Sequence, residues 1–519
     1  MSDAIALEVF RHRCSAIAEE MGAALERSAF SSNIQERRDY SCALFDAHGY
    51  MVAQAAHIPV HLGAMPHSVA AALLHFGSLA DGDVVILNDP HAGGTHLPDF
   101  TTVAPIYVAG ELMGYSATRA HHADVGGMAP GSMPLSQSVF QEGLILPPVK
   151  IVEAGVVNRG VVAIIARNSR TSAERSGDLQ AQFACHAIAT RRMESLCMRM
   201  GCVTVHDMMA QLISYGERRM RALIRTIPDG IYQASDVLDD DGVHPEPLTI
   251  AVTLTVHDDE HSIDFTGTAV ACRGPLNAPR AVTESAVLYA LRTLDGDDMP
   301  ASAGAFRPLH WTIPAGSLLN PPAGVAVAGG NVETSQRIVD VMYRALAHAL
   351  PTQIPAQSAG TMNNWTMGGV TSTGQPFAYY ETLGGGMGAR PSAPGLSGVQ
   401  THMTNTRNTP IEMFERLYPV RVHTLAIRRG SGGAGGMCGG DGICKDIEFL
   451  VPTTISLLTE RRTVAPAGYA GGADGANGVN TITFPDGLTR YAGKGTFDVP
   501  AGSHLHIATP GGGGFGGDV

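Results

Sequence analysis

The sequence predicts an α+β protein of several mixed sheets, with a long N-terminal helix, a central helical segment and a strand-rich, Gly-rich C-terminal half. Apolar residues recur at three- and four-residue steps between Leu7 and Leu25, which is the spacing of an amphipathic helix. Residues 248–267 alternate apolar and polar side chains, as strands do. Helices and strands do not follow one another in a single repeating order, so a wheel of βαβ units is not expected.

The next elements follow from local patterns in the N-terminal part. Residues 37–54 are expected to form a hairpin, because alternating side chains flank the turn sequence "DAHG". Residues 64–77 predict a helix that ends at a glycine. The apolar run in residues 83–90 predicts a buried strand, and residues 101–127 predict two more strands around the turn "AGE".

The character of the chain then changes twice. Residues 151–225 are expected to be largely helical, because glycine is rare between residues 172 and 224. Strands dominate from there on, interrupted by helices at residues 281–294 and 334–350. These changes predict three regions with approximate boundaries: an N-terminal region at 1–150, a helical segment at 151–225, and a strand-rich, Gly-rich α+β region at 226–519.

Glycine is unusually frequent, with 61 residues among 519, and it gathers in clusters such as "GGGMGA", "GGAGGMCGGDG" and "PGGGGFGG". The clusters have no fixed period, so they are not a repeat array. Glycine permits backbone at positive φ and close approach of one main chain to another. Tight turns between short strands are the favoured explanation for most of these clusters.

Composition excludes several classes of function. The chain holds 35 Lys and Arg against 48 Asp and Glu, and its net charge of −13 argues against binding nucleic acid or an anionic membrane. It has no apolar run of 18 residues and no signal-peptide pattern at the N-terminus, so a cytoplasmic protein is expected. Its eight cysteines form no C-x-x-C pair, which favours idle thiols in a reducing compartment.

Motifs for nucleotide binding and for a nucleophilic serine are missing. The sequence contains no G-x-x-x-x-G-K-[ST], no G-x-G-x-x-G between a strand and a helix, and no G-x-S-x-G. We therefore expect no nucleotide site in this chain.

The stretch "NDPHAGGTHLPDF" predicts a metal site. His96 and Asp99 precede one strand of the hairpin expected at residues 101–127, and "RAHHADVGG" places His121, His122 and Asp124 at the end of the returning strand. A hairpin brings its two ends together, so two imidazoles and a carboxylate would converge. Zn²⁺ and Mn²⁺ prefer such nitrogen and oxygen ligands. The alternative is a polar, hydrogen-bonded cluster that caps the hairpin.

Adjacent residues of a strand point to opposite faces, so at most one of His121 and His122 is expected to bind the metal. The other would contact substrate, orient a ligand or lie in the core. Asp39 is a further candidate, although the charges around it at residues 36–38 are expected to be solvated. His61 is a candidate for the cavity wall, and His57 is expected to be structural.

Eight ordered motifs together resemble the hydantoinase B/oxoprolinase family, from about Asn33 to the C-terminus. The motifs are "NDPHAGGTHLPDFTTVAPIY", "RAHHADVGG", "GPLNAPRAVTESAVLYALR", "AGGNVETSQRIVDV", "YYETLGGGMGARP", "TNTRNTPIEMFE", "RRGSGGAGGMCGGDG" and "TPGGGGFG". The family includes B subunits of ATP-dependent N-methylhydantoinase and caprolactamase, the C-terminal half of 5-oxoprolinase, and the related large subunit of acetone carboxylase. His91 stands where the family pattern has an aromatic residue, which puts substrate contacts at that position in doubt.

The resemblance implies a division of labour between two subunits in a hetero-oligomer. A hydantoinase A-type ATPase partner would bind ATP and Mg²⁺, and this chain would bind a divalent metal, Zn²⁺ or Mn²⁺. The acetone carboxylase pattern of His, Asp and a later His falls on His96, Asp99 and His121, and Asp39 stays a candidate for a fourth ligand. His122 and Asp124 would then be catalytic, with Asp124 or Asp39 accepting a proton from water.

The implied reaction is hydrolysis of a small cyclic amide, such as a hydantoin, 5-oxoproline or a lactam. The partner would phosphorylate the carbonyl oxygen with ATP, and metal-activated water in this chain would attack the carbonyl carbon. Two alternatives stay open. One is a subunit of an ATP-dependent ketone carboxylase of the acetone or acetophenone carboxylase type, and the other is a non-catalytic scaffold for the ATPase.

Overall fold

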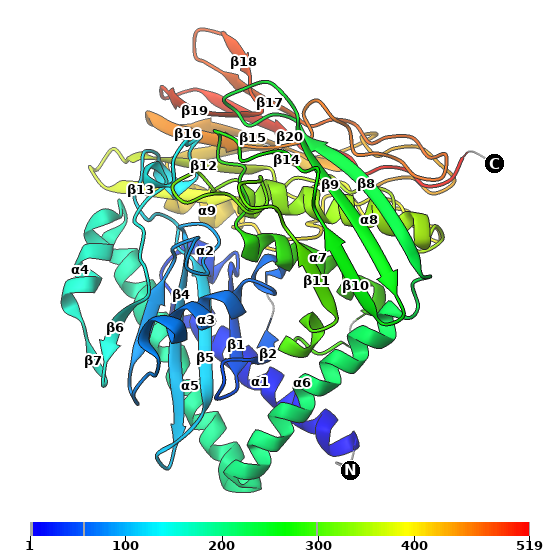
Figure 1. The fold of residues 1–519 in the computed structure, drawn as a ribbon. Coiled ribbons are helices and arrows are strands. Elements are labelled where there is room, and N and C mark those ends of the chain that lie inside the picture. The colour runs from blue at the N-terminus through cyan, green and yellow to red at the C-terminus, as the bar shows by residue number, and fades with distance from the viewer. Residues whose placement is uncertain (1–3, 56–57, 297–298, 518–519) are drawn as a thin grey trace.

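The computed structural model describes residues 4–55, 58–296 and 299–517. Figure 1 shows the N-terminal sheet and its helices in the lower part of the molecule, with one C-terminal sheet, from residues 230–312, beside them at the right and the other two C-terminal sheets above. The N-terminal sheet has the strand order β2-β1-β5-β4-β3-β6-β7, and its strands are β1 (Tyr40–Phe45), β2 (Met51–Ala55), β3 (Val84–Leu87), β4 (Asp99–Val108), β5 (Glu111–His121), β6 (Val149–Glu153) and β7 (Val156–Val157). The expected hairpins are confirmed: β1 pairs with β2, and β4 pairs with β5.

Helices cover this sheet. The long N-terminal helix is confirmed, and it buries Leu7, Phe10, Ile17 and other residues at helical spacing in a core shared with the central helices. The helix predicted at residues 64–77 is also confirmed, and Gly77 caps its end with a φ of 69°. The helices of this half are α1 (Ala4–Ser28), α2 (Ser32–Gln35), α3 (Met65–Phe76), α4 (Arg159–Asn168), α5 (Ser172–Met200) and α6 (Cys202–Ile224).

Residues 151–225 are largely helical, as predicted, but the first of them form strands. Val149–Glu153 forms β6 by pairing with β3, and a turn at Ala154 and Gly155, both at positive φ, leads into β7. A short apolar run has no helical or strand period of its own, so the free edge of β3 decides its conformation. From α4 to α6 the segment is helical as predicted, and α5 packs on α1 and β4.

Where the structure describes it, the C-terminal half contains three sheets. The first is mixed, because β10 runs parallel to β11 and antiparallel to β9. It has the order β11-β10-β9-β8, with β8 (Gly230–Leu238), β9 (Leu248–His257), β10 (Glu260–Asp264) and β11 (Leu309–Thr312). The second has the order β13-β12-β16-β19, with β12 (Asn364–Val370), β13 (Pro376–Glu381), β16 (Thr453–Leu458) and β19 (Lys494–Val499).

The third of these sheets has the order β14-β15-β20-β17-β18, with β14 (Val420–Arg428), β15 (Gly442–Phe449), β17 (Val479–Thr483), β18 (Thr489–Tyr491) and β20 (His504–Ala508). The helices of this half are α7 (Arg280–Asp295), α8 (Ser335–Ala349) and α9 (Ile411–Leu417). Helices α7 and α8, both predicted, supply much of a large core that also includes Val60, Met362 and Met403. This core therefore joins the two halves of the chain. In the described residues, no helix combines the length and hydropathy needed to cross a bilayer.

The glycine clusters lie against one another, which corrects the expectation that they mainly form turns. A Cβ added to Gly386 would lie 1.9 Å from the carbonyl oxygen of Gly440, and one added to Gly439 would lie 2.0 Å from that of Gly512. Gly512 in turn donates its N–H to the carbonyl of Gly440 at 2.9 Å. These segments pack main chain against main chain, at a separation that leaves no room for a side chain.

Candidate metal centre

The β4–β5 hairpin brings the predicted ligands together. Asp99 begins β4 and lies directly opposite His121, the last residue of β5. His96 precedes β4 by one turn of chain, and its carbonyl oxygen accepts the N–H of Asp99 at 3.1 Å. The loop before it is held by Asn88, whose side-chain amide donates to the carbonyl of Leu97 at 2.7 Å. The hairpin geometry expected from the sequence is therefore confirmed.

Two imidazole nitrogens meet at one carboxylate oxygen. Asp99 Oδ1 lies 3.1 Å from His96 Nε2 and 3.2 Å from His121 Nδ1. All three side chains are buried, with at most 2% of any of them exposed. Buried nitrogen and oxygen donors at this mutual separation are the ligand set that Zn²⁺ and Mn²⁺ bind. The arrangement fits a divalent metal ion.

Neighbouring groups orient these donors. The ring of His96 places Nδ1 3.3 Å from the carbonyl oxygen of Ala328, which accepts the Nδ1 proton and leaves Nε2 as the atom that can bind a metal. Glu142 holds this carbonyl in place, because its carboxylate accepts the N–H groups of Val327 and Ala328 at 2.8 and 3.0 Å. The second oxygen of Asp99 accepts the hydroxyl of Thr95 at 2.7 Å. These contacts resemble the supporting hydrogen bonds around metal ligands in general.

The electrostatics keep Asp99 and His121 in the protonation states that metals bind. Burial alone would raise the pKa of Asp99, but His96, His121 and His61 together hold it well below its ordinary value. Burial lowers the pKa of His121 and outweighs its hydrogen bond to Asp99. Burial also acts to lower the pKa of His96, but the charge of Asp99 outweighs it and raises that pKa. An ionised carboxylate and a neutral His121 are ready ligands.

A cavity of about 20 Å³ opens on this cluster, which is room for about one water molecule or ion. Its walls come from segments far apart in the chain. Besides Asp99 and the two ligand-type histidines, the lining includes His61, Asn331, Tyr380 and Thr404. These last three belong to the motifs "AGGNVETS", "YYETLGGG" and "TNTRNT", so separate motifs converge on one cavity.

Sequence reasoning had assigned no site role to Asn331 and Tyr380. Asn331 lies in a π-helical turn (Gly330–Thr334), a distortion frequent at functional sites, and its side-chain nitrogen is 3.2 Å from His96 Nε2. The ring of Tyr380 stacks on that of His121, with centroids 4.6 Å apart. The predicted cavity-wall position of His61 agrees with the structure, since its Nε2 lies 3.4 Å from Asp99 Oδ2. His57 lies outside the described residues.

Asp39, the proposed fourth ligand, lines the same cavity, and its carbonyl oxygen accepts the N–H of His121 at 2.9 Å. Within the described residues, however, the group of converging ligand atoms comprises only His96, Asp99 and His121. The expectation that the neighbouring charges are solvated was wrong for Arg37. Its guanidinium is fully buried, donates to the carbonyl of Tyr380 at 2.8 Å and lies over that ring.

His122 and Asp124, the predicted catalytic pair, are not among the residues that line the cavity. His122 is the residue after β5, and its ring donates from Nε2 to Gln182 Oε1 of α5 at 2.9 Å. Burial lowers its pKa to about 3. Asp124 binds a loop: its carboxylate accepts the backbone N–H groups of Gly126, Gly131 and Arg170 and pairs with the Arg170 guanidinium at 2.9 Å. Both residues therefore have structural partners.

The two adjacent histidines should respond differently to substitution. His121→Ala is expected to lose most of the bound metal, because it removes one of three converging donors. His122→Ala is expected to keep the metal and to lower the free energy of unfolding by about 1–3 kcal/mol, because Gln182 loses its buried partner. Elemental analysis and thermal unfolding of both variants provide the measurement. Metal loss in His122→Ala with retention in His121→Ala would contradict the register described above.

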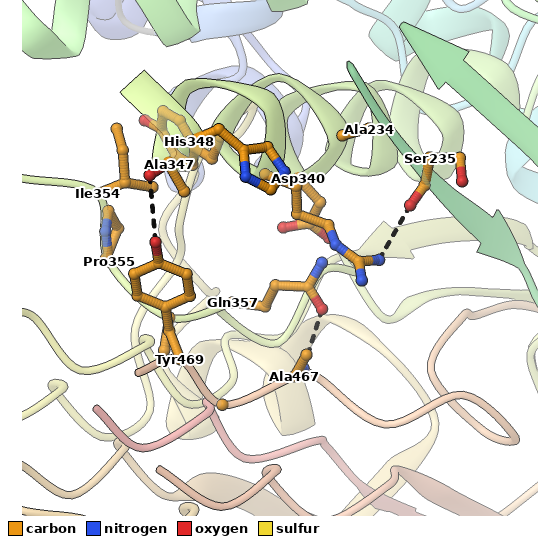
Figure 2. A pocket seen from close by; sticks show the side chains of 14 residues that line it. Ala234, Ser235, Asp340, Ala347, His348, Ile354, Pro355, Gln357, Ala467 and Tyr469 are labelled. Carbon is orange, nitrogen blue, oxygen red and sulfur yellow. Dashed lines mark hydrogen bonds between the residues drawn. The ribbon is translucent and has the colours of Figure 1, made fainter. Parts of the chain in front are cut away.

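A larger cavity of about 400 Å³ is lined by α8, β8 and two loops (Figure 2) and shares no lining residue with the cavity at Asp99. Two of its polar side chains bond to the main chain of the lining: Arg344 donates to the carbonyl of Ser235 at 3.0 Å, and the Tyr469 hydroxyl donates to the carbonyl of Ala347 at 3.2 Å. His91, where the sequence departs from the family pattern, is exposed and lines neither cavity. The small cavity at Asp99 is therefore the candidate site, because the converging donors lie there.

The chain is similar to known proteins over its whole length. A family model described as "Hydantoinase B/oxoprolinase" matches residues 3–518. The chain is 41% identical to 5-oxoprolinase 1 of Arabidopsis thaliana over its full length, and it spans about two fifths of the length of that relative (42%). It is 31% identical to a Pseudomonas sp. protein described as the B-type subunit of a D-/L-hydantoinase, of which the alignment covers 90%.

Two solved structures share the fold. An ATP-dependent caprolactamase from Pseudomonas jessenii superposes with a TM-score of 0.93 at 26% identity, covering all of this chain and 92% of that one. Acetone carboxylase in its nucleotide-free structure superposes with a TM-score of 0.92 at 19% identity, covering 99% of this chain and 76% of that one. The second likeness is evidence of a common fold alone.

Proposed function

Because this chain belongs to the hydantoinase B/oxoprolinase family, we propose that it is the B-type subunit of an ATP-dependent cyclic amide hydrolase. Its substrate would be a small ring with an amide bond, such as a hydantoin, 5-oxoproline or a lactam. The observation that carries the proposal is the buried meeting of His96, Asp99 and His121 at one small cavity. Three such donors face a cavity whose walls come from distant motifs. This arrangement favours a reaction centre over a polar cluster that only caps the hairpin.

A partner ATPase is part of the proposal. The chain spans about two fifths of the 5-oxoprolinases that it matches, and a relative of similar length is described as one subunit of a D-/L-hydantoinase. The sequence also lacks a phosphate-binding loop. We therefore propose that a hydantoinase A-type ATPase, held in a hetero-oligomer, supplies the ATP and Mg²⁺ site.

The residues at the cavity would divide the work as follows. His96, Asp99 and His121 would hold a divalent ion, Zn²⁺ or Mn²⁺, whose contribution when bound is to lower the pKa of a water molecule toward about 7. Ala328 fixes the His96 tautomer, and Tyr380 fixes the plane of the His121 ring. Asp39, the remaining carboxylate of the lining, would accept the proton of the water.

The chain on its own is expected to hydrolyse neither ATP nor cyclic amides. ATP must first make the resonance-stabilised amide carbonyl electrophilic, and the motif for that step lies outside this sequence. The measurement is phosphate release and ring-opened product from 5-oxoproline, hydantoin and caprolactam, with the chain alone and with a co-expressed A-type partner. Turnover by the chain alone would contradict the proposal that a partner subunit supplies the ATP site. Turnover of a ketone that requires bicarbonate would assign the chain to the carboxylase alternative.

A further inference from the structure

A second group of histidines and carboxylates lies on the outer face of the sheet formed by β14, β15 and β20. On β20, His504 and His506 are two residues apart and so point to the same face. On β15, Asp446 and Glu448 occupy the same face, with Glu448 opposite His504 and Asp446 opposite His506. The four side chains form two cross-strand pairs at the surface.

A β-bulge adds a third imidazole. The pairing of β14 with β15 shifts register between Val422 and Thr424, which leaves His423 as the extra residue. Bulges re-aim side chains, and here His423 Nε2 comes to 2.8 Å from Glu448 Oε2. Its ring lies 5.0 Å from the ring of His504, measured between centroids. The ligand-type atoms of these three residues lie within 4.8 Å of one another.

Asp446 orients the ring of His504. His504 Nδ1 lies 3.0 Å from Asp446 Oδ1, so the proton sits on Nδ1 and the lone pair of Nε2 is available. A carboxylate behind a histidine in this way is the usual support of a metal-binding imidazole. His506 Nδ1 lies 3.5 Å from the other oxygen of Asp446. Arg421 is the one competing cation described at this face, 4.0 Å from Glu448.

We propose that His423, Glu448 and His504 form a second divalent transition-metal site, separate from the buried cavity at Asp99. Two imidazole nitrogens and a carboxylate oxygen are suited to Zn²⁺, Cu²⁺ or Ni²⁺ rather than to Mg²⁺ or Ca²⁺. The three side chains are 23% to 42% exposed, so the ion would enter from solvent and keep bound water. The cation would replace the proton that His423 and Glu448 share.

The test uses the whole 519-residue chain and Zn²⁺ as the probe. The protein is first stripped of metal by chelation and dialysis, and its Zn²⁺ binding is then measured by calorimetric titration and elemental analysis. The unchanged chain is expected to bind one molar equivalent of Zn²⁺ more than a His423→Gln/His504→Gln variant. His96→Ala is expected to lose the other equivalent and to keep this one, so the two sites are counted independently. Asp446→Asn is expected to weaken binding at the surface site by about 10–100-fold, as loss of a supporting carboxylate does.

His310→Gln is the matched control. His310 is also exposed and lies 3.1 Å from a carboxylate on a neighbouring strand, that of Glu260, but this pair has no second imidazole. This variant is expected to bind as much Zn²⁺ as the unchanged chain. Binding at the proposed site is expected to weaken below about pH 6.5, as the imidazoles take up protons. An unchanged stoichiometry in His423→Gln/His504→Gln would overturn the proposal, and so would an equal loss in His310→Gln. Circular dichroism of the metal-free variants checks that each of them is folded.

Discussion

Asp99→Asn is expected to abolish metal binding at the buried cavity and to lower ATP-dependent ring opening by about a thousandfold. His96 and His121 both converge on Asp99 Oδ1. The negative charge of this carboxylate would attract the cation to the point where the two imidazoles can also bind it. An amide of the same size preserves the packing but removes the charge, and several kcal/mol of charge stabilisation corresponds to a rate effect of this order.

The measurement combines metal content with turnover in the presence of the A-type partner. Asp83→Asn is a matched control, because Asp83 is equally buried beside the same sheet but pairs with Lys150 at 2.9 Å. That variant is expected to keep its metal. Full metal occupancy in Asp99→Asn, together with undiminished turnover, would place the reaction elsewhere.

Arg461→Ala is expected to destabilise the protein by about 3–5 kcal/mol, the usual cost of leaving buried charges without their partner. Arg461 is fully buried and joins three segments: its guanidinium lies 3.2 Å from Asp236 of β8 and 2.6 Å from Asp340 of α8, and it donates to the carbonyl of Ala465 at 3.1 Å. Helix α8 directly follows the π-helical turn that carries Asn331, so the same change is expected to loosen one wall of the cavity.

The effect should depend on pH. Burial alone would raise the pKa of Asp236, but Arg337 and Arg461 hold it below its ordinary value. The stability that this carboxylate contributes is therefore present above about pH 3.9, its pKa in the unfolded chain, and is lost as the pH falls below that value. Arg461→Ala should reduce this acid sensitivity.

Thermal and denaturant unfolding between about pH 3 and pH 7, a range that spans the unfolded-chain pKa of Asp, provides the measurement. Arg307→Ala serves as the control, because Arg307 is 47% exposed and pairs with Glu217 at 2.9 Å at the surface. An exposed pair is worth about 1 kcal/mol or less, so this variant should unfold nearly as the unchanged chain does. Equal destabilisation by the two substitutions would contradict the claim that the buried ion pairs of Arg461 stabilise the protein more than the exposed pair of Arg307.

Local patterns were sufficient for the elements with a strong period or a clear stop. The spacing from Leu7 to Leu25 predicted α1, and Gly77 marked the end of α3. Patterns failed where neighbours decide the conformation. Val149–Glu153 became a strand because β3 offers it a free edge, and the glycine clusters became layers of main chain because they meet one another.

The sequence by itself determined the candidate ligands and the rule that only one of two adjacent histidines can join them. Hairpin topology brings His96 and Asp99 to the end of the returning strand, and the alternation of a strand separates His121 from His122. These are properties of neighbouring residues, so one-dimensional spacing is enough to state them.

Only the tertiary structure decided which histidine faces the site and what surrounds it. The register that pairs Asp99 with His121 turns His122 toward Gln182 of α5. The polar partners of Asp124 and the walls supplied by Asn331 and Tyr380 come from segments brought close only by folding. Register and long-range contact depend on how sheets and helices pack over the whole chain, and local sequence carries no record of that packing.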